Sequence, residues 1–70
     1  MCGIIGINSN KQVSATIINS LKKLEYRGYD SAGIATLSNG LINEVKSEGR
    51  VDNLERNSLV KNMEGTIGIG

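Results

Sequence analysis

The chain has 70 residues, eight of them basic and seven acidic, with one cysteine and neither histidine nor proline. A chain of this length forms at most one small domain. That domain is only marginally stable by itself, because it buries only about 60% of the surface that its unfolded form exposes. One cysteine excludes an internal disulfide, and an ordinary zinc site is not expected without histidine. The near-neutral charge argues against a nucleic-acid-binding arm and a membrane-surface helix.

The composition also bears on the compartment. No stretch approaches the length of a membrane span, and the first residues lack the basic leader and long apolar run of a secretory signal. A single cysteine fits a reducing compartment best. We therefore expect a cytoplasmic protein that needs no metal or cofactor and has neither nucleic acid nor membrane as a partner.

The first half of the chain predicts a strand, a turn and a helix. Residues 2–7 are rich in isoleucine, which favours a short buried strand. Asn8-Ser9-Asn10 is typical of a turn, and Ser9 or Asn10 is expected to cap the next element. From Val13 to Leu24 apolar residues recur at helical spacing, which predicts an amphipathic helix with Lys22 and Lys23 on its solvated face.

The second half predicts a hairpin, a weaker helix and a final strand. Gly28 ends the helical region, and Ser31–Leu37 reads as a strand. Ser38-Asn39-Gly40 contains the Asn-Gly signal of a tight hairpin, so the return strand runs from Leu41 to near Glu48. Gly49 breaks that strand.

The segment from Asp52 to Asn62 predicts a helix with Val51, Leu54 and Leu59 directed inward. Alternating isoleucine and glycine over Thr66–Gly70 then resemble the first half of another strand. The expected fold class is α+β, in the order strand, helix, β-hairpin, helix and partial strand.

Cys2 carries the only thiol and directly follows the initiator methionine. A lone cysteine beside an isoleucine-rich strand is most often a small buried hydrophobe. Its position favours another interpretation, because removal of Met1 gives Cys2 a free α-amine beside its thiol. Such an amine, with a reference pKa of about 7.7–8.0, can act as the base that activates the thiol. Cys2 is therefore the candidate nucleophile, in a mechanism that needs no histidine.

A second informative segment, LEYRGYDSAGIA, spans residues 24–35. From its chemistry alone it predicts a helix end, a glycine turn with a local Arg27–Asp30 ion pair worth about 0–1 kcal/mol if exposed, and the start of a strand. Together with MCGIIGI at residues 1–7, it resembles the class II glutamine amidotransferases, whose glutaminase domain begins with a nucleophilic cysteine.

Within that family, the residues on either side of Arg27 distinguish the branches. Amidophosphoribosyltransferases usually have His before Arg-Gly and Gln after it, and asparagine synthetases usually have Arg-Gly-Pro-Asp. The form Tyr26–Ser31 is similar to that of the glucosamine-6-phosphate synthases, as are Glu48–Val51 and Gly65–Gly70. The resemblance therefore extends over essentially the whole chain.

The resemblance implies an N-terminal-nucleophile hydrolase fold, an αββα sandwich, of which residues 1–70 form only the first part of the glutaminase domain, without the sugar-isomerase domains. It implies that Cys2 attacks the side-chain amide of glutamine, releasing ammonia and leaving a γ-glutamyl thioester for water. Arg27 and Gly28 are expected to shape this site. In complete enzymes the ammonia passes to fructose 6-phosphate, and the glutamine step needs no metal.

Several features of the family lie outside these 70 residues. A segment of the Ala-His-Thr-Arg-Trp type follows the position of Gly70, and an Asn-Gly oxyanion hole and a substrate-binding aspartate come later. One lost oxyanion donor costs about 2.7–4 kcal/mol, and lost positioning removes up to about 7–11 kcal/mol. We therefore expect little or no glutaminase activity from residues 1–70 alone, and unpaired strand edges. A complementing polypeptide would supply the missing parts.

Two interpretations stay open at this point. In the enzymatic one, the chain is the first piece of a glutamine-dependent aminotransferase, either a gene remnant or one segment of a split protein. In the non-catalytic one, which we favour for the isolated chain, it is a degenerate fragment that acts as an interaction module or is not stably folded. A redox-active thiol is disfavoured because the chain has no resolving cysteine.

Overall fold

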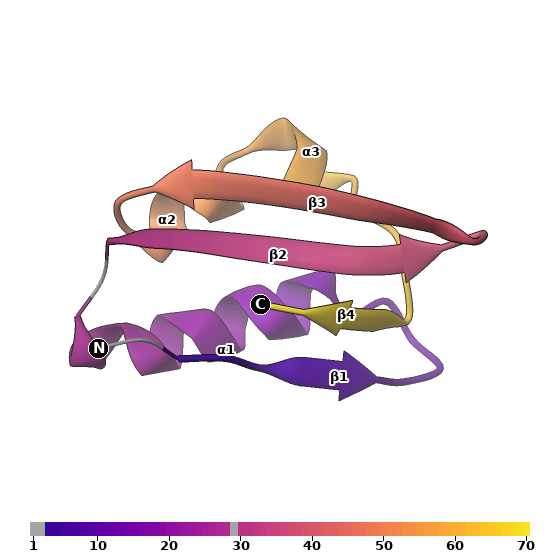
Figure 1. Cartoon of the computed structure of the whole chain (residues 1–70), viewed down its shortest axis with the longest axis horizontal. Helices are drawn as coiled ribbons and strands as arrows, with labels where there is room; N and C mark the ends of the chain where they lie inside the picture. The colour runs from indigo at the N-terminus through magenta and orange to yellow at the C-terminus, as the bar shows by residue number, and fades with distance from the viewer. Residues whose placement is uncertain (1–2, 29) are drawn as a thin grey trace.

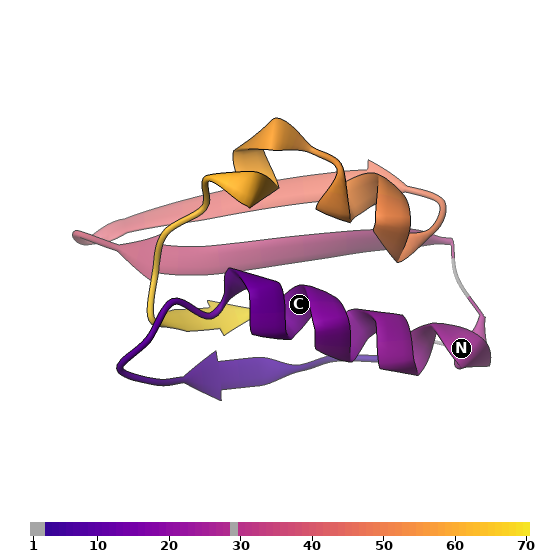
Figure 2. The same ribbon diagram turned by 180° about the vertical axis from the view of Figure 1, so that it is seen from behind.

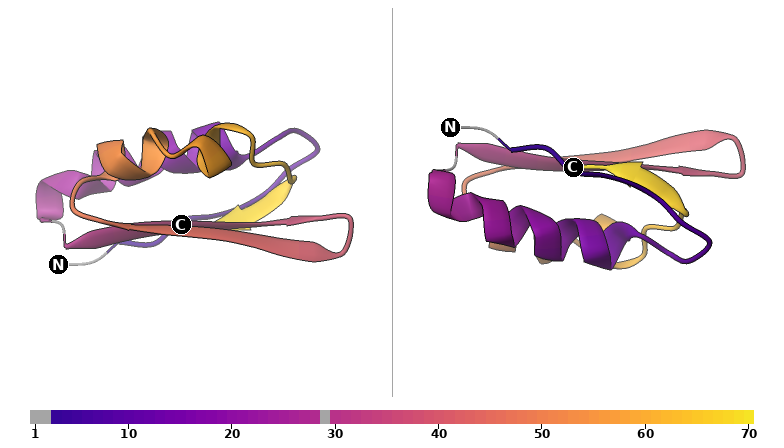
Figure 3. Two further views of the ribbon diagram at one scale, coloured as in Figure 1. Left: turned by 90° about the horizontal axis from the view of Figure 1, so that it is seen from above. Right: turned by 90° about the horizontal axis from the view of Figure 1, so that it is seen from below.

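The computed structural model of the chain describes residues 3–28 and 30–70, with only the backbone at residue 27. In these residues a four-stranded antiparallel sheet carries three α-helices (Figures 1 and 2). Seen edge-on in Figure 3, the helices share one side of the sheet, and no helix lies on the other side of this described part of the chain. The α+β class predicted from the sequence is confirmed.

The sheet has the strand order β1–β4–β2–β3, with β1 at Gly6–Asn8, β2 at Ser31–Ser38, β3 at Leu41–Glu48 and β4 at Ile67–Ile69. The last strand in the sequence is therefore an inner strand, between β1 and β2 (Figure 1). Beyond β1, the ladder continues through Ile5 and Gly70, whose two backbone hydrogen bonds are 3.0 and 2.8 Å long. The chain thus brings its two ends into one sheet.

The first strand is shorter than predicted and begins later. It also includes Asn8, which pairs with Ile67 although the sequence predicted a turn there. Cys2, at the start of the predicted strand, lies outside the described residues. The turn begins at Ser9, whose N–H donates to the carbonyl of Thr66 at 2.8 Å. Pairing with β4 therefore extends the strand past the position at which local turn propensity would end it.

Helix α1 runs over Ser14–Leu24, one residue shorter than predicted, and continues into a 3₁₀ turn, η1, at Glu25–Arg27. The expected cap by Ser9 or Asn10 is wrong, because the N-cap position is Val13, which makes no side-chain cap bond. The N–H of Val13 instead donates to the carbonyl of Gly65 at 3.0 Å. This tie to the segment before β4 sets where the helix begins.

The single helix predicted over 52–62 is wrong. The structure has two short helices, α2 at Val51–Glu55 and α3 at Ser58–Lys61, separated by a break at Asn57. The Asn57 side chain accepts the N–H of Leu59 at 2.9 Å and so caps α3. Because the helix restarts there, its buried face changes: Val60 faces the core, and Leu59, predicted to face inward, is 67% exposed.

The hairpin between β2 and β3 follows the prediction closely. Asn39 and Gly40 connect the strands with φ values of 52° and 76°, both in the left-handed region that the tight hairpin turn requires. Ser38 then pairs with Leu41, and the register continues without a bulge to the pair Ser31 and Glu48. Eight residues of each strand are therefore paired.

The core lies between the sheet and the helices. Its members are the inward apolar residues of α1, β2, β3, α2 and α3, with the residues beside them: Val13, Ile17, Ile18, Leu21, Ile34, Val45, Val51, Leu54, Val60 and Met63. The predicted stripe of α1 and the predicted burial of Val51 and Leu54 are confirmed. The buried hydroxyl of Thr36 donates to the carbonyl of Glu64 at 2.7 Å, which satisfies its hydrogen-bonding requirement.

The opposite side of the sheet, which we call the open face, is apolar at its centre. Side chains alternate along a strand, so the burial of Ile34 and Thr36 against the helices directs Leu37 to the other side. Leu37 pairs with Ile42 on β3 and with Ile67 on β4, and these three form a cross-strand row with Ile69 close by. All four are exposed.

Candidate functional site

A cavity of about 550 Å³ lies where the beginning of the chain, the loop after η1 and the last residue converge. Its lining comes from the ends of α1, β2 and α2 and from both ends of the chain: Gly3, Leu21, Leu24, Glu25, Gly28, Asp30, Ser31, Ala32, Gly33, Val51 and Gly70. Gly3 belongs to the first motif that the sequence singled out, MCGIIGI, and Gly28 is one of several lining residues from the second, LEYRGYDSAGIA. The fold therefore brings those motifs together from positions 25 residues apart.

Gly3 is the neighbour of Cys2, and it passes close to the end of α1. A Cβ atom built at Gly3 would lie 2.8 Å from Cδ1 of Leu24, closer than real side-chain contacts come. Cys2 itself, the predicted nucleophile, lies outside the described residues. The position of Gly3 nevertheless puts the chain at the wall of the cavity one residue after the thiol.

Gly28 ends the 3₁₀ turn with φ of 110°, a conformation that L side chains rarely adopt. Its N–H donates to the carbonyl of Glu25 at 2.9 Å. The predicted end of the helical region at Gly28 is therefore confirmed, and its residue type follows from the backbone conformation. The Arg27 side chain and Tyr29 lie outside the described atoms, so the predicted Arg27–Asp30 ion pair and the role of Arg27 stay predictions.

Sequence reasoning missed Glu25. Its carboxylate Oε2 accepts the N–H of Val51 at 2.7 Å, and its Oε1 lies 3.4 Å from Nη2 of Arg50. The sequence contains one indication of this contact. The N-cap residue of α2 is Arg50, whose side chain makes no cap hydrogen bond. A helix start without a Ser, Thr, Asp or Asn at the N-cap leaves N–H groups for a partner elsewhere in the chain.

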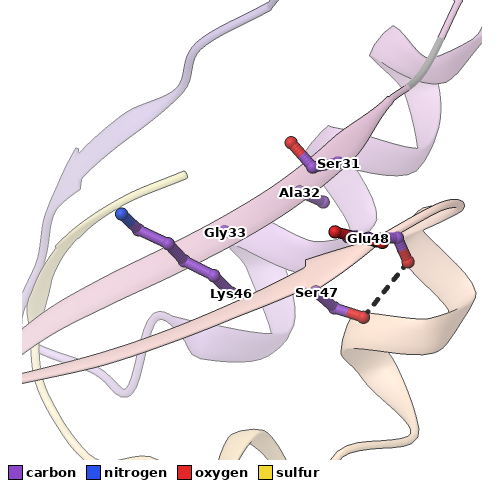
Figure 4. A pocket seen from close by; sticks show the side chains of 6 residues that line it. All are labelled: Ser31, Ala32, Gly33, Lys46, Ser47 and Glu48. Carbon is purple, nitrogen blue, oxygen red and sulfur yellow. Dashed lines mark hydrogen bonds between the residues drawn. The ribbon is translucent and has the colours of Figure 1, made fainter.

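A second hollow, of about 460 Å³, adjoins the first along β2 (Figure 4). The two share Ser31, Ala32 and Gly33, and the second is completed by β3. In Figure 4 Lys46 extends across Gly33, in agreement with the 3.3 Å between its Cγ and a Cβ built on that glycine. A side chain at Gly33 would therefore compete with the stem of Lys46.

The helices beside the cavity are joined by an ion-pair cluster. Lys22 of α1 donates to Glu55 of α2 at 2.6 Å and lies 3.5 Å from Asp52. The hydrogen bond that Lys22 donates to Glu55 is the main cause that raises the pKa of Lys22 above its ordinary value of 10.5. Lys22 is thus only partly on the solvated face predicted for the Lys22-Lys23 doublet.

Across residues 3–28 and 30–70, no group of three or more His, Cys, Asp or Glu side chains is arranged to hold a metal ion. In the same residues, no helix has the length and apolar character needed to cross a bilayer.

The whole chain aligns with known proteins. It is 53% identical over 70 residues to the isomerizing glutamine–fructose-6-phosphate aminotransferase of Brucella abortus, 51% to that of Mesorhizobium japonicum and 50% to that of Bartonella quintana. Each alignment covers 100% of the chain and 12% of the relative. The chain matches the amino-terminal part of these aminotransferases. No family model matches the chain.

The similarity to the glutamine–fructose-6-phosphate aminotransferases confirms the resemblance inferred from MCGIIGI and LEYRGYDSAGIA. The chain spans about an eighth of the length of these relatives, since the aligned share is 12%. Both sequence motifs and all four strands lie inside the matched region. The names of these relatives describe the complete enzymes as aminotransferases for glutamine and fructose 6-phosphate.

Proposed function

We propose that residues 1–70 form the first part of a glutaminase domain in which Cys2 is the nucleophile. The observation that carries the proposal is the cavity that Gly3 and Gly28 line together, because it draws the residue after the thiol and the loop of Arg27 to one place. Similarity of about half the residues to enzymes named for glutamine supports glutamine as the substrate.

In the proposed chemistry, Cys2 provides both the nucleophile and the base. After removal of Met1, the α-amine of Cys2 takes the thiol proton, and Sγ bonds to the side-chain carbonyl carbon of glutamine. The amide C–N bond then breaks, the amine returns its proton to the departing nitrogen, and ammonia leaves a γ-glutamyl thioester. Water hydrolyses the thioester to glutamate and restores the thiol. Arg27 and Gly28 shape the pocket for the substrate.

The N-terminal-nucleophile hydrolase sandwich is the proposed fold of the whole domain, and the open face supports it. Among residues 3–28 and 30–70, helices cover one side of the sheet only (Figure 3), and the other side carries Leu37, Ile42, Ile67 and Ile69. In a sandwich of two sheets, the inner faces pack about 10 Å apart through such side chains. A second sheet on the open face would therefore complete the αββα layering.

Fructose 6-phosphate enters the proposal only through the relatives, whose names include it. In a complete protein we propose that ammonia formed at Cys2 reaches fructose 6-phosphate on sugar-isomerase domains, giving glucosamine 6-phosphate in the cytoplasm. A complementing polypeptide, or further sequence, would supply the remaining glutamine-binding groups.

A second candidate function is non-catalytic association. The exposed apolar row on the open face favours it, because contiguous apolar surface commonly marks an interaction site. In this alternative the chain binds a partner through the sheet and Cys2 has no unusual reactivity. The two candidates therefore differ in what they predict for the thiol.

The test is covalent capture by a diazoketone analogue of glutamine, which does not require turnover. Its diazo carbon takes up a proton and then bonds to Sγ as dinitrogen leaves. The chain is prepared from Cys2 onward with the α-amine either free or acetylated. We expect the free-amine form to be labelled at Cys2 at least about tenfold faster, as for a general base.

The controls are Cys2→Ala, which should give no adduct, and an unstructured peptide with an N-terminal Cys-Gly. Labelling of the free-amine chain no faster than that of the peptide would contradict the catalytic proposal. Equal rates for the free and acetylated chains would contradict the role of the amine. Only the first outcome would favour the association candidate, in which Cys2 has no unusual reactivity.

A further inference from the structure

The loop that carries Arg27 and Gly28 is bonded at both ends to the short segment 49–51, which connects β3 to α2. At one end, the Glu25 carboxylate accepts the N–H of Val51 at 2.7 Å. At the other, the N–H of Gly49 donates to the carbonyl of Asp30 at 2.8 Å. These two contacts join segments that are 19 to 26 positions apart in the chain.

The Glu25 contact is the stronger of the two on chemical grounds. Its acceptor is a charged carboxylate, and its donor is the first N–H of α2, a group without an intrahelical partner. Only 9% of the Glu25 side chain is exposed, against 59% for Arg50, so water competes little for the bond to Val51.

Glu25 also touches the loop through its backbone. Its carbonyl accepts the N–H of Gly28 at 2.9 Å, so the residue that bonds to α2 is the one that closes the 3₁₀ turn. Glu25, Gly28 and Val51 all line the cavity described above. Movement of Glu25 away from Val51 would therefore move the turn and the cavity wall together.

We propose that Glu25 is a positioning residue, which holds the Arg27-Gly28 loop at the cavity by bonding through its carboxylate to the start of α2. The inference rests on the proposed function for its catalytic meaning, but the bond itself is a property of the fold. Glu25 does not itself touch the reacting atoms. It acts through the orientation of the loop.

The test compares the whole chain with Glu25→Ala, Glu25→Asp and Glu25→Gln. Glutamine keeps an oxygen at the same reach, whereas the aspartate carboxylate is one methylene shorter. Glu55→Ala is the matched control, because Glu55 also joins α1 to α2 through Lys22 but does not line the cavity. Circular dichroism establishes which variants are folded, and the Asp variant is used if the Ala variant is not.

Two readouts separate positioning from general stability. The first is amide hydrogen exchange at Val51 and the NMR shift of the Gly28 amide. The second is the rate of Cys2 labelling by the diazoketone analogue divided by its rate with iodoacetamide, a ratio that cancels intrinsic thiol reactivity. We expect Glu25→Ala and Glu25→Asp to speed Val51 exchange at least about tenfold, and to lower the ratio about tenfold. Glu25→Gln should stay within about threefold, and Glu55→Ala should leave the ratio unchanged.

The inference would be overturned if folded Glu25→Ala or Glu25→Asp kept the wild-type NMR shift of the Gly28 amide and the wild-type rate of amide exchange at Val51. An equal drop of the labelling ratio in Glu55→Ala would also overturn it, because general loosening would then suffice. If the wild-type chain shows no selective labelling, the proposed function fails, and the two amide measurements alone decide whether Glu25 holds the loop.

Discussion

Gly68 occupies the middle of β4, an inner strand, and has no room for a side chain. A Cβ atom at this position would lie 2.7 Å from Cδ1 of Ile17 and 3.0 Å from the carbonyl oxygen of Ala35. Ile17 is fully buried in α1, so it cannot turn toward solvent. Gly68→Ala therefore forces α1 away from the sheet or distorts the ladder.

The expected cost of Gly68→Ala is that of overpacking, about 1–3 kcal/mol. A chain of 70 residues has a total stability of roughly 3.5–10 kcal/mol at 0.05–0.15 kcal/mol per residue. A loss of about 2 kcal/mol would lower Tm by roughly 8–16 °C in a domain of this size. Thermal unfolding followed by circular dichroism measures the shift.

Two further variants make the prediction specific. Gly6→Ala is the matched control, because a Cβ there would meet only Cγ2 of Ile69 at 3.8 Å, an ordinary contact. Ile17→Val removes the atom nearest to the new methyl group and should recover about 1 kcal/mol in the Gly68→Ala background. Recovery stays incomplete because the Ala35 carbonyl still lies 3.0 Å away. A Gly68→Ala loss no larger than that of Gly6→Ala would refute the packing of α1 on β4.

Two other predictions concern the helices. Val60→Ala should lower the free energy of unfolding, measured in urea, by about 1.5 kcal/mol, because it removes two buried methyl groups. Leu59→Ala should change that free energy little, because Leu59 is 67% exposed. A larger loss for Leu59→Ala than for Val60→Ala would contradict the helix break at Asn57. The raised pKa of Lys22, caused first by its bond to Glu55, means that its stabilising contribution is present below the ordinary value of 10.5 and is lost as pH rises through the raised pKa. Lys22→Met should therefore flatten the alkaline fall of Tm above about pH 10.5 relative to Lys23→Met, and equal curves for the two variants would contradict the ion pair.

Local patterns in the sequence predicted the elements that depend on nearby residues. The apolar spacing of Ile17, Ile18 and Leu21 was enough for α1, and Asn39-Gly40 was enough for the hairpin, because each signal lies within the element that it describes. The break before α3 was missed because Asn57 was read as an ordinary helical position. Its cap on Leu59 competes with continuation of α2.

Contacts between distant segments were the part that the sequence could not supply. The start of α1 depends on Gly65, and the extension of β1 through Asn8 depends on Ile67, more than 50 positions away. The Glu25 bond to Val51 is of the same kind, since neither residue alone signals the other. For the site, the two motifs predicted which segments of the chain form it. Only the structure showed that Gly3 and Gly28, one from each motif, line the same cavity.

In the proposed mechanism one residue provides both the attacking sulfur and the base, which requires an unblocked amine on Cys2. The most direct measurement is the intact mass of the chain purified from cells, followed by sequencing of its first residues. We predict a mass that corresponds to a chain beginning at Cys2. A mass that retains Met1, or a formyl or acetyl group at the first nitrogen, would contradict the mechanism.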